Sequence, residues 1–182
     1  MPELPEVETI VRDLNRKLKN KKVVSVESLD KKVWQLTAGE VKNILGKKIK
    51  AVRRRAKMII FDLADYYLIA HLKMTGQLVY KNKTSVIAGD HPIVNQDKKL
   101  PSQFTRVIFK FNDQSRLYFN DVRRFGWIKL VTKDKFIEFN NQLGIEPLNP
   151  NFTLEYFNKI LSPKLKTSIK QILLDQKYIS GL

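Results

Sequence analysis

The first six residues, Met1-Pro2-Glu3-Leu4-Pro5-Glu6, place a potential amine nucleophile beside carboxylates. Removal of the initiator methionine would leave Pro2 with a secondary amine at the end of the chain. Such an amine can attack a sugar C1′ and form an iminium ion, which divides one difficult displacement into easier steps. Because an α-amino group titrates near pH ~8, part of it is neutral at pH 7. Pro2 is therefore a candidate nucleophile.

Glu3 and Glu6 lie close enough along the chain to serve this amine as acid or base. A carboxyl group in this place can protonate a ribose ring oxygen or accept a sugar proton during elimination. In the alternative interpretation, both residues merely complement the positive end of a helix that starts here. The residue types alone leave both interpretations open.

The charge of the chain favours a polyanionic partner. Lys and Arg number 34 against 18 Asp and Glu, which gives a formal net charge of +16. A field of this sign attracts nucleic acid, and less often an anionic membrane surface. A general enrichment in lysine is the alternative explanation. The sequence holds no cysteine, so disulfides and cysteine-ligated zinc are excluded for this chain, and no apolar run reaches the ~18 residues of a membrane span.

Hydrophobic periodicity predicts a helix over Pro5–Lys19, followed by many short strands. The helix carries an apolar stripe at the spacing i, i+3, i+4, i+7, formed by Val7, Ile10, Val11, Leu14 and Leu18. The expected strands are residues 22–28, 48–54, 58–63, 66–71, 77–80, 105–111, 116–120 and 126–131. A short helix over Ala38–Leu45 is expected to end at Gly46. Short strands separated by turn residues indicate an antiparallel sandwich or barrel.

The rest of the chain predicts a long loop and then a change to helices. Residues 81–103 are polar and aperiodic, and we expect either a surface loop or a binding loop. After a weak helical segment at 135–141, residues 143–150 predict a rigid extended linker. Residues 152–161 and 166–177 predict amphipathic helices whose apolar faces need partners. The expected domains are therefore 1–133, a linker at 134–150, and an incomplete helical domain at 151–182.

Six segments together resemble the formamidopyrimidine-DNA glycosylase family over nearly the whole chain. They are Pro2-Glu3-Leu4-Pro5-Glu6-Val7-Glu8-Thr9, Arg54-Arg55-Ala56-Lys57, His71-Leu72-Lys73-Met74-Thr75-Gly76, Asp121-Val122-Arg123-Arg124-Phe125-Gly126, Leu143-Gly144-Ile145-Glu146-Pro147-Leu148 and Lys166-Thr167-Ser168-Ile169-Lys170. The resemblance implies an α+β chain. An N-terminal eight-stranded antiparallel β-sandwich with flanking helices would carry catalysis, and the start of a helix–two-turns–helix domain would follow it.

The resemblance also implies catalytic roles near the N-terminus. Pro2 would be the nucleophile that forms a Schiff base with the sugar, and Glu3 the general acid. Glu6 would orient the sugar or a water molecule. Lys57 would contact the phosphate of the damaged nucleotide, which suits a flexible ammonium group; without the resemblance, a solvated lysine at a strand start would be preferred.

Further residues are implied as DNA contacts. Met74, Arg123 and Phe125 would form the wedge that fills the gap left by a flipped-out base, although core packing is the usual fate of Met and Phe. Arg124 and Lys166 would contact the DNA backbone. His71 would contact a phosphate, with a purely structural histidine as the alternative.

The family pattern continues beyond Leu182 with a damage-reading loop and a zinc finger, so we expect a truncated, poorly active fragment without a cofactor of its own. The implied function is base-excision repair by a bifunctional glycosylase/AP lyase. Its partner would be double-stranded DNA containing oxidised purines or abasic sites. We expect a monomer in the bacterial cytoplasm, without a membrane partner. An endonuclease VIII-type enzyme for oxidised pyrimidines and a non-catalytic basic DNA-binding module remain alternatives.

Overall fold

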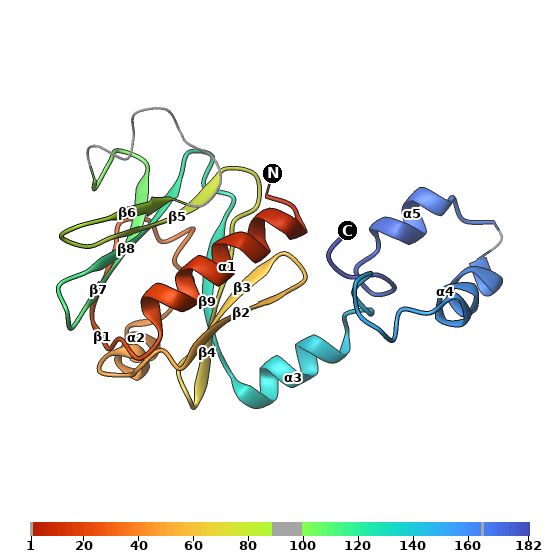
Figure 1. Cartoon of the computed structure of the whole chain (residues 1–182), viewed down its shortest axis with the longest axis horizontal. Helices are drawn as coiled ribbons and strands as arrows, with labels where there is room; N and C mark the ends of the chain where they lie inside the picture. The colour runs from red at the N-terminus through yellow and green to blue at the C-terminus, as the bar shows by residue number, and fades with distance from the viewer. Residues whose placement is uncertain (1, 89–99, 165) are drawn as a thin grey trace. The chain divides into compact units, whose positions relative to one another are not determined.

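The computed structural model describes residues 2–88, 100–164 and 166–182 of the chain. These fall into two units, residues 1–133 and 134–182, and each is described by itself (Figure 1). No helix in these described ranges is long and apolar enough to cross a membrane.

Two antiparallel sheets form the first unit. Their strands are β1 Val23–Ser28, β2 Ala51–Arg55, β3 Met58–Asp62, β4 Tyr66–His71, β5 Gly76–Lys81, β6 Val86–Ala88, β7 Thr105–Phe111, β8 Arg116–Asp121 and β9 Trp127–Thr132. One sheet has the order β1-β7-β8-β5-β6 and the other β2-β3-β4-β9. Apolar residues of both sheets share one buried core, as Phe119 and Ile59 do. The predicted α+β sandwich class is confirmed.

The strand count differs from the prediction of eight, because the described residues contain a ninth strand, β6. It pairs with β5 through Val79↔Ala88, Tyr80↔Ile87 and Lys81↔Val86. The side-chain oxygen of Asn82 accepts hydrogen bonds from the backbone N–H of Thr84 and Ser85 and so shapes the tight turn between the strands. Three residues are too few for a periodic signal. The rest of the predicted 81–103 loop falls largely on residues 89–99, outside the described residues.

Helix α1 (Leu4–Leu18) covers part of the core. It begins and ends one residue earlier than the predicted helix. The five residues of the predicted apolar stripe are all buried. Asn15 fixes the helix to β2, because its side-chain oxygen accepts a hydrogen bond from Val52 N at 2.8 Å. Helix α2 (Ala38–Ile44) begins at Thr37, and Gly46 follows it with φ 76°, in the predicted terminating position.

Two connections pass from one sheet to the other at the same end of the sandwich. Residues 72–75 join β4 to β5, and residues 122–126 join β8 to β9. The pairs Gly76↔Asp121 and His71↔Trp127 bring the ends of these connections together. A Cβ added at Gly76 would lie 2.4 Å from Leu72 O, so the first connection requires glycine there. Two motifs about 50 residues apart in sequence thus become neighbours.

The second unit contains α3 (Lys133–Asn141, which starts at the last residue of the first unit), α4 (Leu154–Leu161), the 3₁₀ helix η1 (Ser162–Lys164) and α5 (Ile169–Leu174). Ile160, Ile172 and Ile179 form its small core. Helix α5 is shorter than the predicted 166–177 because Ser168 caps its start: the Ser168 side chain accepts from Gln171 N.

The segment predicted as a linker is tied to the end of the chain. Gly144 N donates to Gln176 O at 2.9 Å, and the Ser180 hydroxyl donates to Gly144 O at 2.7 Å. A Cβ on Gly144 would come within 2.0 Å of Tyr178 O, so only glycine fits this approach. Ile160 and Ile172 of the two predicted helices pack together in the core of this unit, whereas Leu148, Leu154 and Leu174 remain well exposed.

Candidate active site

Pro2 is buried directly before helix α1, and Glu3 is the N-cap residue of that helix. Glu6 Oε2 accepts a hydrogen bond from Glu3 N at 2.8 Å, which closes the first turn. This contact is the helix-terminus role that the sequence left open for Glu6. The Glu3 side chain remains half exposed, so it can meet a ligand that approaches the N-terminus.

Lys57 brings a cation to Glu3 from the β2–β3 hairpin. Its Nζ lies 2.5 Å from Glu3 Oε2, although its own side chain is only 13% exposed. Lys57 occupies a two-residue turn whose first residue, Ala56, has φ 50°. Arg54 Nη1 donates to Ala56 O at 3.0 Å and holds this turn. The local backbone therefore fixes where the ammonium group is presented.

An ion-pair network ties the hairpin to helix α1. Arg54 Nε lies 2.9 Å from Glu8 Oε2, and Arg12 Nε lies 2.9 Å from the other oxygen of the same carboxylate. The hydrogen bond from Arg54 is the main cause that lowers the pKa of Glu8 below its ordinary value, with Arg12 adding to it. The ionised Glu8 thus holds the β2–β3 hairpin against helix α1. This keeps Lys57 on the hairpin close to Glu3 at the start of the helix.

His71 ends β4 beside this hairpin, since it pairs with Met58 in the sheet register. Burial, with the nearby charges of Lys73 and Lys57 adding to it, lowers the pKa of His71 to about 4. Its Nδ1 accepts a hydrogen bond from Lys73 N at 3.0 Å, and its ring lies 5.7 Å from that of Trp127. The ring is thus neutral at pH 7, and the Nδ1 contact leaves the proton on Nε2. His71 can donate a hydrogen bond without carrying charge.

Met74, Arg123 and Phe125 form one exposed cluster, here called the wedge cluster. Arg123 stacks over the Phe125 ring at 4.8 Å, and its Nη1 lies 3.3 Å from Met74 Sδ. Met74 and Phe125 are 47% and 46% exposed, which is unusual for large apolar side chains. The core-packing interpretation of these two residues therefore does not describe the structure. Lys32 adds a second cation, 5.6 Å from the Phe125 ring centroid.

The carboxylate of Asp121 holds the two connections that carry the wedge cluster. It is completely buried. One oxygen accepts from Thr75 Oγ1 at 2.5 Å and from Arg123 N at 3.2 Å, and the other accepts from Gly126 N at 2.7 Å. Arg123 N also donates to Thr75 Oγ1 at 3.0 Å. The backbone beneath the wedge cluster is thus fixed before any ligand arrives.

Arg124 is committed to an internal partner. Its Nε lies 2.5 Å from Oδ2 of Asp30, which is buried, while Arg124 itself is half exposed and has φ 60°. Burial acts to raise the pKa of Asp30, yet the hydrogen bonds from Arg124 and Lys32 N outweigh it and lower the pKa. To contact the DNA backbone as predicted, Arg124 would have to bind a phosphate while it keeps its ion pair with Asp30.

Lys166 belongs to the second unit, whereas the residues described above belong to the first. It is exposed and lies two residues before the Ser168 cap of α5. For metals, no group of three or more His, Cys, Asp or Glu side chains among the described residues could hold an ion.

Sequence reasoning missed three residues that support the site: Asp30, Lys32 and Asp121. Asp30 and Arg124 are 94 positions apart, and no local pattern joins them. Asp121 gave a weak signal, since an acidic residue that ends a buried strand needs donors to compensate its burial.

The family model for the formamidopyrimidine-DNA glycosylase N-terminal domain matches residues 1–128. Proteins named formamidopyrimidine-DNA glycosylase from Pelotomaculum thermopropionicum and Wolbachia pipientis (strain wPip) are 41% and 37% identical over the whole chain. The chain spans 62% of the length of each relative.

Solved structures give the same result. The Lactococcus lactis Fpg in complex with DNA containing an abasic site matches the whole chain with a TM-score of 0.77 at 29% identity, and the chain covers 62% of it. A complex of the same protein with Fapy-dG-containing DNA matches 99% of the chain with a TM-score of 0.76 at 29% identity, and 63% of that structure is covered. This chain belongs to the formamidopyrimidine-DNA glycosylase family.

Proposed function

We propose that this chain carries the catalytic part of a bifunctional DNA glycosylase/AP lyase that removes oxidised purines, including 8-oxoguanine and formamidopyrimidines. The observation that carries the proposal is the Glu3–Lys57 ion pair directly beside Pro2. It unites a potential amine nucleophile, a carboxyl group and a phosphate-binding cation at one helix terminus. Membership of the family and the likeness to DNA complexes support it.

The reaction uses the amine of Pro2 after removal of Met1. The nitrogen lone pair attacks C1′ of the damaged nucleotide, and the base leaves with the electrons of the glycosidic bond. The nitrogen then loses its N–H proton to solvent, the C1′–O bond of the sugar ring breaks as its oxygen is protonated, and an iminium ion forms between C1′ and the proline nitrogen. This cation withdraws electrons, so a base can remove a C2′ proton and the 3′-phosphate leaves. Release of a base and a strand break thus follow from one nucleophile.

Glu3 and Lys57 divide the acid–base and electrostatic work. Glu3 supplies the proton that the sugar ring oxygen needs as the ring opens. Lys57 binds the phosphate of the damaged nucleotide and thereby gives up its contact with Glu3, which frees the carboxyl group for the sugar. His71, neutral and with a proton on Nε2, donates a hydrogen bond to the same phosphate region. Glu6 keeps the helix terminus closed and orients the sugar.

The wedge cluster enables access to C1′. A nucleotide within a duplex must leave the base stack before the amine can reach it, at a cost of roughly a few kcal/mol. Met74, Arg123 and Phe125 replace that stacking with a thioether, a planar guanidinium group and a ring. Double-stranded DNA with an oxidised base or an abasic site is therefore the proposed partner.

The proposal is tested by Glu3→Gln in the product of the full gene, prepared without Met1. Base release from a duplex with one formamidopyrimidine should fall by a factor of about 10² or more, while DNA affinity stays within a few-fold. Glu27→Gln is the matched control, since Glu27 is exposed on β1. Base release at the unmodified rate by the Glu3 variant would assign Glu3 a helix-capping role only.

A further inference from the structure

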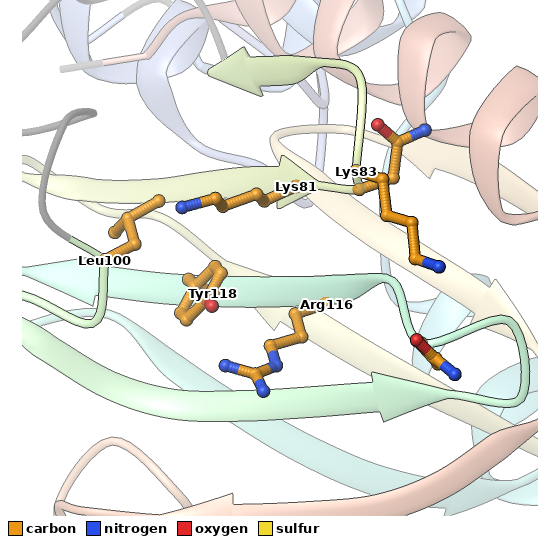
Figure 2. A pocket seen from close by; sticks show the side chains of 7 residues that line it. Lys81, Lys83, Leu100, Arg116 and Tyr118 are labelled. Carbon is orange, nitrogen blue, oxygen red and sulfur yellow. The ribbon is translucent and has the colours of Figure 1, made fainter.

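A second basic cavity lies on the five-stranded sheet, far from the Pro2 region. It has a volume of about 240 Å³, and Lys81, Lys83 and Arg116 line it together with Tyr118. Figure 2 shows Lys81, Tyr118 and Arg116 between Lys83 on one side and Leu100 on the other. Gly76 and Asp121 mark the wedge end of β5 and β8, and Lys81 and Arg116 mark the opposite end. Five residues of strand separate these ends by roughly 17 Å.

Lys81 and Arg116 of this cavity stand in a row across three strands with Lys110, which lies beside the cavity. Lys81 pairs with Arg116 in the β5–β8 register, and Arg116 pairs with Lys110 in the β7–β8 register. Like charges directly opposite each other destabilise a sheet. This row has no compensating ion pair with a carboxylate anywhere in residues 2–88, 100–164 and 166–182. Asp113, the acidic residue of the β7–β8 turn, forms an ion pair with Lys21.

Asn82, a neutral residue of the lining, also offers donors rather than an acceptor. Asn82 Oδ1 accepts hydrogen bonds from Thr84 N at 2.9 Å and Ser85 N at 2.6 Å. Its oxygen is therefore occupied, and its amide N–H groups are left for a ligand. Gln114 lies on the far side, in the β7–β8 turn. A lining of ammonium, guanidinium and amide donors is complementary to an oxyanion.

The floor of the cavity is rigid and apolar. Tyr118 is almost fully buried and packs with Val79 and Ile108 in a small cluster on the face of the sheet opposite the main core. Leu100 packs on this cluster. The cavity is smaller than the roughly 300–1,000 Å³ of sites that enclose whole organic ligands. Its size suits a phosphate group with a small attached part.

We propose that Lys81, Lys83 and Arg116 form a phosphate-binding site separate from the Pro2 region. A phosphate there neutralises the repulsion of the cross-strand row and accepts the free amide donors. Its source is either a phosphate of the DNA backbone or a free phosphate monoester. The proposal is independent of the chemistry at Pro2, so its failure would leave that chemistry untouched.

Thermal unfolding of the chain in inorganic phosphate, against chloride at equal ionic strength, tests the site. At phosphate ten-fold above its Kd, the Tm should rise by about 3–6 °C. The variant Lys81→Gln/Arg116→Gln should show a much smaller rise, which leaves only the stabilisation by phosphate bound elsewhere, as at Lys57. Its Tm in chloride should be at least that of the parent, because a repulsion is removed. Lys19→Gln/Lys42→Gln, which removes the same charge from exposed positions, should keep the rise. An equal rise in the site variant, or an equal loss in the control variant, would overturn the proposal.

Binding to a long duplex across salt concentrations distinguishes the two sources. If the ligand is a DNA phosphate, the site variant should bind more weakly than the control variant. Its slope of log K against log salt should then be shallower by about 1–2. If both variants bind the duplex equally while only the site variant has lost the phosphate effect, the ligand is a free phosphate. Both results support the site.

Discussion

His71 illustrates how one side chain acquires a function that its type alone does not give. Burial against Trp127 and the charges of Lys73 and Lys57 lower its pKa to about 4. A protonated His71 would add a third cation to a crowded basic region. As a neutral donor it can bind a phosphate with no change of charge across the physiological pH range.

The pKa of His71 predicts a pH-dependent stability. The folded protein binds fewer protons than the unfolded chain between the unfolded pKa near 6.5 and the folded pKa of about 4. The contribution of His71 is therefore present above pH 6.5 and is lost as the pH falls through this window, by on the order of 3 kcal/mol. Urea unfolding at pH 7, 5.5 and 4.5 measures it.

His71→Gln is the comparison for that measurement. Its stability should fall less steeply over the same pH interval, because glutamine does not titrate. The lowered pKa values of Glu8 and Asp30 also reduce the stability as the pH falls, but at lower pH, and the parent and the variant share this effect. Parallel pH profiles for the two proteins would show that the pKa of His71 is the same in the folded and the unfolded chain, which would contradict the prediction.

At the scale of elements, the site depends on two connections that pass between the sheets. The β4–β5 connection carries Met74, and the β8–β9 connection carries Arg123 and Phe125. Asp121 joins them through three hydrogen bonds. A buried carboxylate with several donors costs much to disturb, whereas the side chains above it are exposed and cost little to replace.

This contrast separates recognition from stability. Met74→Ala/Phe125→Ala should leave the Tm within about 2 °C but reduce the preference for damaged over intact DNA about tenfold or more, since stacking is worth ~1–3 kcal/mol per base. Asp121→Asn should lower both the Tm and the preference for damaged DNA, with about 1–3 kcal/mol lost from the free energy of unfolding. Competitive binding to the two duplexes and thermal unfolding report the two effects.

Val122→Ala provides the control for the wedge variant. Val122 is a similarly exposed apolar residue in the same connection, and it is not one of the three side chains of the wedge cluster. Its variant should keep the full preference for damaged DNA. An equal loss of preference in the control would mean that general exposure of apolar surface, rather than the cluster, is responsible.

The elements that were predicted well have long or repeated local signals. Helix α1 has five apolar residues at helical spacing, and all five are buried. Strand β6 and the true start of α5 were missed, because a three-residue strand and a single capping serine give little pattern. The wedge residues were proposed from family resemblance alone. Their partners Asp30 and Asp121 depend on contacts between distant segments, which single-sequence periodicity does not encode.

At the scale of the whole molecule, the structure changes the expected count of phosphate contacts. The sequence suggests four: Lys57, His71, Arg124 and Lys166. His71 is neutral, and Arg124 is paired with Asp30. Of the four proposed contacts, Lys57 and Lys166 then remain as the cations expected to release counterions.

This reduced count predicts a shallow salt dependence for binding to a short duplex centred on an abasic site. The slope of log K against log salt should lie near −2 rather than between −3 and −4. Fluorescence anisotropy from 50 to 300 mM salt measures it. A slope of −3 or steeper would mean that cations outside this set, such as those of the second basic cavity, contact even a short duplex.

The central claim is that the amine of Pro2 forms the covalent intermediate. Borohydride reduction of the iminium ion should link the product of the full gene irreversibly to DNA carrying an abasic site. Intact-mass measurement first separates molecules that begin at Pro2 from molecules that retain Met1. Only the former should be trapped, because an acylated proline nitrogen has no lone pair available for attack. Trapping of equal efficiency in protein that retains Met1 would contradict the account and assign the nucleophile to a lysine, with Lys57 the first to test.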